Sequence, residues 1–398
     1  MRARLLALLA LSAAWLGPAA AARAQDAATL GAQLSSAMRG ASWASGAFAR
    51  DLDTGKVLVD VRGGVTRIPA SVEKLYTTSA LWLRLGPDAR LSTTVAGQGF
   101  LDPDGVWQGD VYLRGGGDPS LSTRGLALLA RRVAATGVVR VSGRIRGDES
   151  YFDAARGGPR TGLAYDRDLT GVLGALTVNR GWSRRGGPAA EAARRFTAAL
   201  RSEGIRVSGA AGVGVAPPDA RPLAALRSPT VRSLTSATLL PSDNFYAETL
   251  LKDLGALDGT AGTTAAGAAV VRAELSELGL RPRIADGSGL SRANRTSPRQ
   301  VVGLLDELHD LPIGPAFEAS MALVGRTGTV SRRMRGTAAQ GACRAKTGTL
   351  SDVSALVGLC TTAAGRTVAF AILMNRTSIW RAHAVQDRMV ATLARYSG

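Results

Sequence analysis

Three short groups of residues could together carry out nucleophilic catalysis without a histidine. They are Ser71-Val72-Glu73-Lys74, Ser242-Asp243-Asn244 and Lys346-Thr347-Gly348, in this order along the chain. Pro69 and Ala70 stand before Ser71, which predicts that the serine begins a helix. Helical spacing then places Lys74 one turn later on the same face, within reach of the serine hydroxyl. Burial and a second lysine would lower the pKa of the Lys74 amine, so that it could act as the base that activates Ser71.

The second group supplies a proton relay. Ser242 follows Pro241 just before a predicted helix, and its hydroxyl can pass a proton between Lys74 and the amine that leaves. Asn244 can hold Lys74 and an amide of the substrate. Ser242 and Asn244 are therefore predicted catalytic residues, together with Ser71 and Lys74.

The third group suits a substrate that ends in a carboxylate. Lys346 lies in a predicted strand, and its charge, with the hydroxyls of Thr347 and Thr349, can bind such a group. Gly348 lets the substrate backbone come close to the strand. We expect the backbone amides of Ser71 and Thr349 to form the oxyanion hole. The alternative is that a capped helix, a loop serine and a surface strand match this pattern by chance.

Rare residues strengthen the case for a lysine base. The chain has 49 lysines and arginines, of which only four are lysine: Lys56, Lys74, Lys252 and Lys346. Arginine stays protonated in proteins and cannot act as a base, whereas lysine can. The two histidines, His309 and His383, lie in segments with helical patterns. This context argues against a Ser-His-Asp triad and against a metal site, and nothing in the sequence calls for a cofactor.

The first residues of the chain have the pattern of an export signal. Arg2 and Arg4 precede an apolar run, and Ala22-Arg23-Ala24 is a good cleavage site, so residues 1–24 are predicted to be a signal peptide. An uncleaved anchor or a core helix is the alternative. No later run reaches the ~18 apolar residues of a membrane span, which predicts no transmembrane anchor after signal removal. We expect the mature protein in the periplasm or the extracellular cell-wall space.

The net charge of +18 admits several anionic partners. The arginines are scattered singly and in pairs, without the interleaved aromatic residues that single-stranded nucleic acid requires. The sequence therefore predicts no nucleic-acid partner, and a compositional bias of a solvated surface remains the simpler interpretation.

The hydrophobic pattern divides the mature chain into two predicted units. Residues 25–90 and 236–398 read as one mixed α/β (α+β) catalytic domain, with an antiparallel sheet flanked by helices. Residues 91–235 read as an inserted β-rich domain. Its predicted strands are 91–96, 110–114, 139–146, 174–179 and 207–215, with helices at 124–136 and 189–203. The apolar positions of the last helix, 379–396, favour packing on the sheet, with membrane binding as the alternative.

These motifs and their order resemble the class C low-molecular-mass penicillin-binding proteins, which are D-alanyl-D-alanine carboxypeptidases and often also endopeptidases. Further stretches resemble the same family over nearly the whole mature chain. They are Tyr112-Leu-Arg-Gly-Gly-Gly-Asp-Pro119, Ser242-Asp-Asn-Phe-Tyr-Ala-Glu248, Asp286-Gly-Ser-Gly-Leu-Ser291, Asn294-Arg295 and Lys346-Thr-Gly-Thr-Leu350. Ser71 and Ser242 are 171 residues apart, which fits the insert of this family and not β-lactamases with the Ser-Asp-Asn motif.

The resemblance implies a β-lactamase/transpeptidase-like fold and a cell-wall substrate. It implies that the side chain of a diamino acid in the stem peptide binds to Asp148, Arg295, Leu350 and Ser351, although Asp148 can equally be a turn residue. Peptidoglycan peptides are then the substrate, and β-lactams acylate Ser71. A β-lactamase or esterase with the same motifs, and a catalytically silent wall-binding protein, are the alternatives.

The two cysteines suggest a disulfide. Cys343 and Cys360 are symmetric about the predicted turn between two strands, so they could face each other across the hairpin. An exported protein can keep such a bond. Two buried small residues are the alternative.

Overall fold

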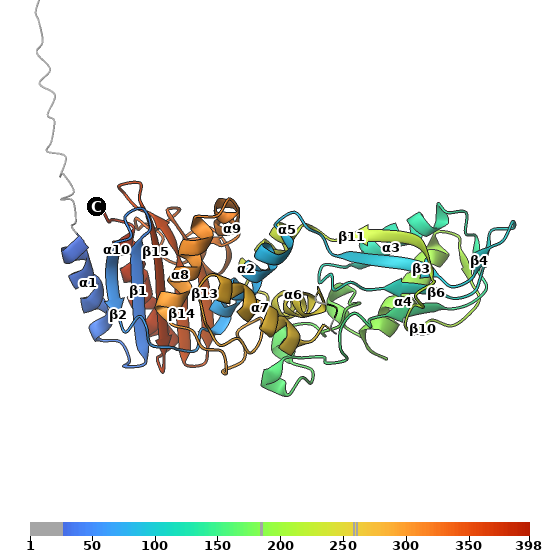
Figure 1. The fold of residues 1–398 in the computed structure, drawn as a ribbon, viewed down its shortest axis with the longest axis horizontal. Coiled ribbons are helices and arrows are strands. Elements are labelled where there is room, and N and C mark those ends of the chain that lie inside the picture. The colour runs from blue at the N-terminus through green and yellow to red at the C-terminus, as the bar shows by residue number, and fades with distance from the viewer. Residues whose placement is uncertain (1–26, 184–185, 258, 260–261) are drawn as a thin grey trace, which may run out of the picture.

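The computed structural model describes residues 27–183, 186–257, 259 and 262–398, and it is elongated (Figure 1). The predicted signal peptide, residues 1–24, lies outside the described residues. One end of the molecule is built around a six-stranded sheet, the other around two smaller sheets, with α5, α6 and α7 between them. No helix among the described residues is long and apolar enough to cross a membrane.

The six-stranded sheet is antiparallel throughout and joins the two ends of the chain. Its order is β12 (Ala322–Leu323), β13 (Cys343–Leu350), β14 (Val353–Thr361), β15 (Thr367–Asn375), β1 (Ser45–Asp51) and β2 (Val57–Val61). Strand β1 pairs with β15 over its full length, from Ser45 opposite Met374 to Asp51 opposite Val368.

Alternation along the central strands gives the sheet two buried faces. In β15, Ala369, Ala371 and Leu373 join one apolar cluster, which also holds α2 (Glu73–Leu85) and α8 (Pro298–His309). The intervening Phe370 and Ile372 join the other cluster, with α1 (Ala27–Arg39) and α10 (Ile379–Leu393). Because side chains of a strand alternate in direction, near-continuous apolar strands require helices on both faces. The predicted mixed fold with helices around an antiparallel sheet is confirmed.

The remaining helices complete this half. They are α5 (Val231–Leu239), α6 (Asn244–Leu257), α7 (Thr264–Glu277) and α9 (Gly314–Ala319), with the short 3-10 turns η1 (Ala70–Val72) and η5 (Gly328–Val330). Helix α10 packs on the sheet through Val390 and Leu393, as expected, while Trp380 near its start is 80% exposed. Neither α5 nor α9 was apparent in the sequence pattern.

The segment between α2 and α5 forms two sheets with a core of their own. The five-stranded sheet has the order β10 (Gly212–Val213), β8 (Ile145–Asp148), β6 (Val111–Arg114), β3 (Ser92–Gly97), β11 (Arg221–Arg227). The four-stranded sheet has the order β4 (Phe100–Leu101), β5 (Val106–Gln108), β7 (Arg140–Val141), β9 (Arg206–Val207). Helices α3 (Thr123–Ala134) and α4 (Gly187–Ser202) share this core. This segment also contains three short 3-10 turns, η2 (Pro159–Thr161), η3 (Arg167–Leu169) and η4 (Asn179–Gly181). Of these, η3 contacts the start of α6.

Three strand predictions in this segment are wrong. The predicted strand 139–146 is two strands in different sheets, β7 and β8, because Gly143 packs against the backbone of Gly109 and breaks the run. The predicted strand 207–215 likewise divides into β9 and β10. Residues 174–179 form no strand. Their apolar side chains Leu176 and Val178 are buried from a loop instead, which satisfies the same hydrophobic pattern.

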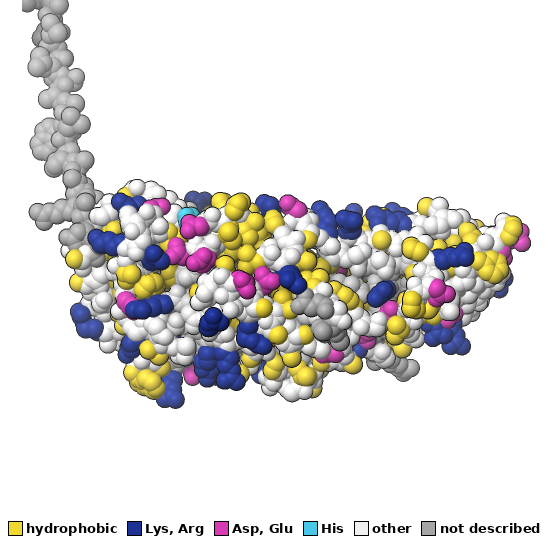
Figure 2. Space-filling model, viewed as in Figure 1, with side chains coloured by type: hydrophobic (Ala, Val, Ile, Leu, Met, Phe, Trp, Pro, Cys, Tyr) yellow, Lys and Arg dark blue, Asp and Glu magenta, His cyan; other side chains and the backbone are white. Residues whose placement is uncertain are grey.

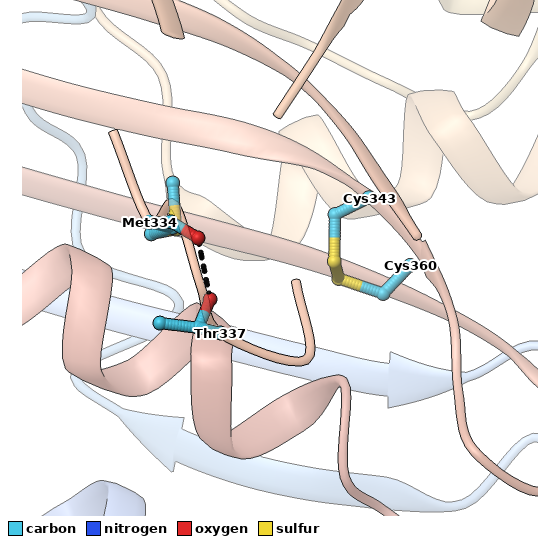
Figure 3. The surroundings of a disulfide bond; sticks show 4 residues. All are labelled: Met334, Thr337, Cys343 and Cys360. Atoms are coloured by element: carbon cyan, nitrogen blue, oxygen red, sulfur yellow. Dashed lines mark hydrogen bonds between the residues drawn. A yellow bond between two sulfur atoms is a disulfide. The ribbon is translucent and has the colours of Figure 1, made fainter. Parts of the chain in front are cut away.

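The predicted disulfide is present. Cys343 on β13 lies directly opposite Cys360 on β14, and their sulfur atoms are bonded (Figure 3). Both residues are fully buried, beside the loop in which Thr337 donates a hydrogen bond to the carbonyl of Met334. The disulfide links the two strands of the hairpin β13–β14, and Lys346-Thr347-Gly348 lies on β13.

Candidate active site

Ser71 is held at a close crossing of three backbone segments. It lies in η1, which leads directly into α2. A Cβ at Gly348 would lie 2.5 Å from the carbonyl oxygen of Pro69 and 3.1 Å from the amide of Ser71. A Cβ at Gly289 would lie 1.9 Å from the carbonyl oxygen of Ala70. Glycine at both positions therefore lets β13 and the 286–291 loop approach Ser71.

Lys74 is one helical turn beyond Ser71 and has no exposed surface. Its Nζ donates hydrogen bonds to Ser71 Oγ (2.9 Å), Asn244 Oδ1 (2.7 Å) and the carbonyl oxygen of Ser288 (2.7 Å). An ammonium has three hydrogens, and three acceptors are present. A neutral amine would keep the two stronger acceptors, Asn244 and Ser288, and direct its lone pair toward the hydroxyl of Ser71. The geometry thus fits both the protonated and the base form of Lys74.

Burial lowers the pKa of Lys74 from 10.5 to about 8, and the negative charges of nearby carboxylates, led by Asp286 and Glu248, oppose this shift. Glu248 accepts hydrogen bonds from the amides of Gly287 and Ser288, at 3.1 and 2.9 Å. It therefore fixes the loop whose carbonyl accepts from Lys74. Glu73 beside Lys74 is fully buried, and burial raises its pKa well above the usual range.

Ser242 and Lys346 form a second pair in the site. Lys346 Nζ donates to Ser242 Oγ at 2.7 Å and to the carbonyl oxygen of Thr347 at 2.8 Å. Burial and the charge of Lys74 lower the pKa of Lys346 well below its usual value. Ser242 has φ of 63°, a left-handed conformation that a serine adopts only when the surrounding structure enforces it. Lys346 is fully buried rather than open to a ligand, and its amine contacts the site through the Ser242 hydroxyl.

The segment between α2 and α5, which holds the predicted insert, reaches this site. Asn244 Nδ2 donates to the carbonyl oxygen of Asp168, in η3, at 2.8 Å. Arg180, in η4, binds both carboxylate oxygens of Asp243 at 2.9 and 2.7 Å and lies 5.0 Å from the centroid of the Phe245 ring. Residues between α2 and α5 therefore help to orient Asp243 and Asn244 of the Ser242-Asp243-Asn244 group. Sequence reasoning missed these residues, because no local pattern links positions more than 60 residues apart.

A pocket of about 840 Å³, the active-site pocket, has Asn244 in its wall. From the sheet half it is lined by Asn244, Leu290, Arg292, Thr349, Leu350 and Ser351, and from the insert by Arg160, Arg167, Asp168 and Thr170. Four predicted site residues thus line one pocket: Asn244, Thr349, Leu350 and Ser351. Thr347 donates a hydrogen bond to Thr329 Oγ1 at 2.7 Å.

Four predicted substrate-binding residues do not line this pocket: Thr347, Gly348, Asp148 and Arg295. Asp148 ends β8 in the insert, 1% exposed, and accepts hydrogen bonds from the amides of Ser150 and Ala216, both at 2.9 Å. Arg295 donates to two backbone carbonyls, those of Arg292 and Asn294. In its place Arg292 lines the pocket, where it donates to Ser351 Oγ at 2.9 Å and pairs with Asp352.

The histidines take no part in this arrangement. His309, at the end of α8, pairs with Glu318 at 2.7 Å, and burial lowers the pKa of His383 on α10. Among the described residues no group of three or more histidine, cysteine or acidic residues could hold a metal ion. The site contains a serine, a buried amine and hydroxyl and amide partners, which is the set needed for acyl transfer through a serine ester.

Comparisons with known proteins agree with this chemistry. The model of the D-Ala-D-Ala carboxypeptidase 3 (S13) family matches residues 30–164 and 164–396. The D-alanyl-D-alanine carboxypeptidase of Actinomadura sp. (strain R39) is 33% identical, over 89% of this chain and 82% of that protein. Carboxypeptidase DacB of Mycolicibacterium smegmatis is 32% identical, over 82% and 75%. The crystal structure of penicillin binding protein 4 (dacB) from Haemophilus influenzae superposes with a TM-score of 0.79 at 20% identity, covering 91% of this chain and 99% of that one.

Proposed function

The chain belongs to the D-Ala-D-Ala carboxypeptidase 3 (S13) family of serine-type peptidases, and on this premise we propose that Ser71 is its nucleophile and Lys74 its base. The single observation that supports these roles most directly is the 2.9 Å contact between the buried amine of Lys74 and Ser71 Oγ. Each further role follows from a contact made by this pair or by the second pair, Ser242 and Lys346.

Acylation begins when the neutral amine of Lys74 takes the proton of Ser71 Oγ. The serine oxygen attacks the carbonyl carbon of the penultimate D-alanine, and the amides of Ser71 and Thr349 stabilise the oxyanion. The C–N bond then breaks. Lys74 returns its proton through the hydroxyl of Ser242 to the amine of the terminal D-alanine, which leaves. Water hydrolyses the ester on Ser71 with Lys74 again as the base, so protons balance over the cycle.

The substrate lies along β13 in this proposal. Its terminal carboxylate meets Thr347 and Thr349, with the positive charge of Lys346 behind Ser242, and its scissile carbonyl lies at Gly348 and Thr349. The acyl side then continues toward Leu350 and Ser351. Gly348 has no side chain to block this path, which supports a peptide backbone held against the strand.

We propose that the diamino acid side chain binds at the far end of the same pocket. Arg292, Leu350 and Ser351 line this end, and a guanidinium fork with a hydroxyl suits a carboxylate. Arg292 thus takes the role that the sequence assigned to Arg295. Asp168 is the acidic side chain that lines the pocket, in the place predicted for Asp148, and it suits the amine of the same side chain.

The substrate and location follow from the same chemistry. Peptidoglycan stem peptides and β-lactams are the proposed ligands, and one related structure is described as a complex of penicillin binding protein 4 with a β-lactam. Such a substrate lies outside the cytoplasm, so the signal pattern of residues 1–24 supports export.

Mass spectrometry of purified wall fragments tests this function. We expect loss of one alanine from pentapeptides for carboxypeptidase activity and loss of cross-linked dimers for endopeptidase activity. The variant Ser71→Ala should do neither and should not be labelled by a fluorescent penicillin. Equal labelling of Ser71→Ala would overturn the role of Ser71, and rapid turnover of nitrocefin without any change in the peptides would favour a β-lactamase.

A further inference from the structure

A second pocket adjoins the active site and is strongly cationic. Its volume is about 560 Å³. It is lined by the segment before Ser71, the turn after β13 and the end of β15. Arg292 lines both this pocket and the active-site pocket, so the two pockets are neighbours that share this side chain.

Five arginines and one carboxylate line this arginine pocket: Arg62, Arg67, Arg292, Arg295, Arg376 and Asp352. Asp352 pairs with Arg292. Arg67 is buried, and its guanidinium donates to backbone carbonyls only, including Ala44 at 2.8 Å. In the described part of the chain no carboxylate pairs with Arg62, Arg295 or Arg376. The pocket therefore holds more positive charge than the protein itself neutralises.

Two of the three unpaired arginines, Arg295 and Arg376, are held in place by neighbouring groups. Arg376 lies 5.0 Å from the ring centroid of Trp43, which supports its guanidinium from one side. Arg62 and Arg376 both have φ of 51°, so each projects from a tight, left-handed backbone position. Asn375 ties this end of β15 to the segment before Ser71, through two hydrogen bonds with the backbone of Ile68, at 2.9 and 3.0 Å. A site fixed in this way loses little entropy when it binds an anion.

The position of the pocket relative to β13 identifies its part of the substrate. With the scissile carbonyl at Thr349, an extended substrate advances about 3.3 Å per residue along the strand. The diamino acid then meets Ser351 and Arg292. The residue before it lies beyond the turn at Asp352, where the arginine pocket begins. The charge of this pocket therefore meets the acyl side of the peptide, two residues before the alanine that becomes esterified.

We propose that the arginine pocket binds a carboxylate on the residue that precedes the diamino acid. This subsite deepens the proposed function and rests on it. Arg62 and Arg376 present planar guanidinium forks, which bind carboxylates in a bidentate manner, and neither is consumed by an internal ion pair. The side chain of Arg292, shared with the active-site pocket, favours a substrate group over a separate polymer.

Two matched peptides test the subsite. Both end in D-Ala-D-Ala after the same diamino acid, and they differ only in whether the preceding residue is glutamate or glutamine. For the unaltered protein we expect KM for the glutamate peptide to be roughly fivefold to tenfold lower, with kcat equal within about twofold, because one charge-assisted pair is gained at a partly exposed site. The preference should shrink as salt is added.

The double variant Arg62→Gln, Arg376→Gln should reduce this preference to less than about twofold and leave kcat unchanged within the same limit. The matched control is Arg206→Gln, Arg227→Gln, two exposed arginines of the insert whose loss changes the net charge equally. The control should keep the full preference. A general effect of charge would instead lower the preference in both variants and overturn the subsite.

Failure of the subsite and failure of the proposed function are distinguishable. If both peptides are cleaved with the same KM, the subsite is wrong and the activity stands. If neither peptide is cleaved, the proposed function fails. The subsite is then tested separately, by calorimetric measurement of the binding of the two peptides to Ser71→Ala. Equal affinity of Ser71→Ala for the two peptides overturns it.

Discussion

The pH dependence of acylation tests the base assigned to Lys74. Burial lowers the pKa of this amine from 10.5 to about 8. At pH 7 about a tenth of the protein would then carry a neutral Lys74, against about three parts in ten thousand at the ordinary pKa. The shift gives a roughly 300-fold gain in the reactive form, worth about 3 kcal/mol.

The assay is the second-order rate of labelling by a fluorescent penicillin between pH 5.5 and 9.5. This rate reports the protonation state of the free enzyme. The base must lose its proton to act, so the rate should rise about tenfold per unit of pH below 8 and level off above it. Lys74→Arg keeps the charge but cannot release a proton, and it should lower the rate by about three orders of magnitude or more.

Hydrolysis of the penicillin itself at each pH is the control, measured without protein. A rate that does not change between pH 5.5 and 9.5 would refute the reasoning, as would a rate that still rises tenfold per unit above pH 9. The first result would mean that the base is already neutral or is not Lys74, and the second that burial does not shift its pKa.

Three further perturbations follow from the same contacts. Glu248→Gln keeps an acceptor for the amides of Gly287 and Ser288 but removes a negative charge that raises the pKa of Lys74. The pH at which the labelling rate levels off should therefore fall below 8, by about half a unit. A shift of this pH to a higher value would contradict the prediction. Gly348→Ala places a Cβ 2.5 Å from the carbonyl oxygen of Pro69. Labelling by the penicillin should therefore slow at least about tenfold, while the circular dichroism spectrum stays unchanged. An unaltered rate would show that β13 and the segment before Ser71 can move apart to accommodate the methyl group. Cys343→Ser with Cys360→Ser should lower the free energy of unfolding by about 3 kcal/mol in urea titration, because the disulfide joins residues that are 17 positions apart in the chain. An unchanged midpoint would contradict the chain-entropy argument.

Local patterns determined the parts of the site that depend on short distances along the chain. Ser71 and Lys74 are three residues apart at a helix start, so helical geometry by itself brings them together. The disulfide between Cys343 and Cys360 was predictable for a related reason, since the register of a hairpin follows from its turn. The strands and helices that carry these residues have regularly spaced apolar side chains, so their type is predictable from the sequence.

The strands of the insert were less predictable. They are short, and several have only two residues, so the apolar pattern does not distinguish a strand such as β7 from a buried loop such as 174–179. The predicted division of the chain at residues 90 and 235 stays a prediction.

Only the tertiary structure decided which side chains complete the site. Arg292 and Arg295 are three residues apart in one loop, and composition cannot tell which guanidinium faces the pocket; the backbone carbonyls of the loop capture Arg295 and leave Arg292 free to meet Ser351. Lys346 turned out to be fully buried against Ser242 instead of open to a ligand. Contacts between the insert and the second motif, such as that of Arg180 with Asp243, join residues far apart in the chain. The sequence by itself therefore determined the contact between the proposed nucleophile and its proposed base, because a helix brings them together locally, whereas long-range packing decided what surrounds them.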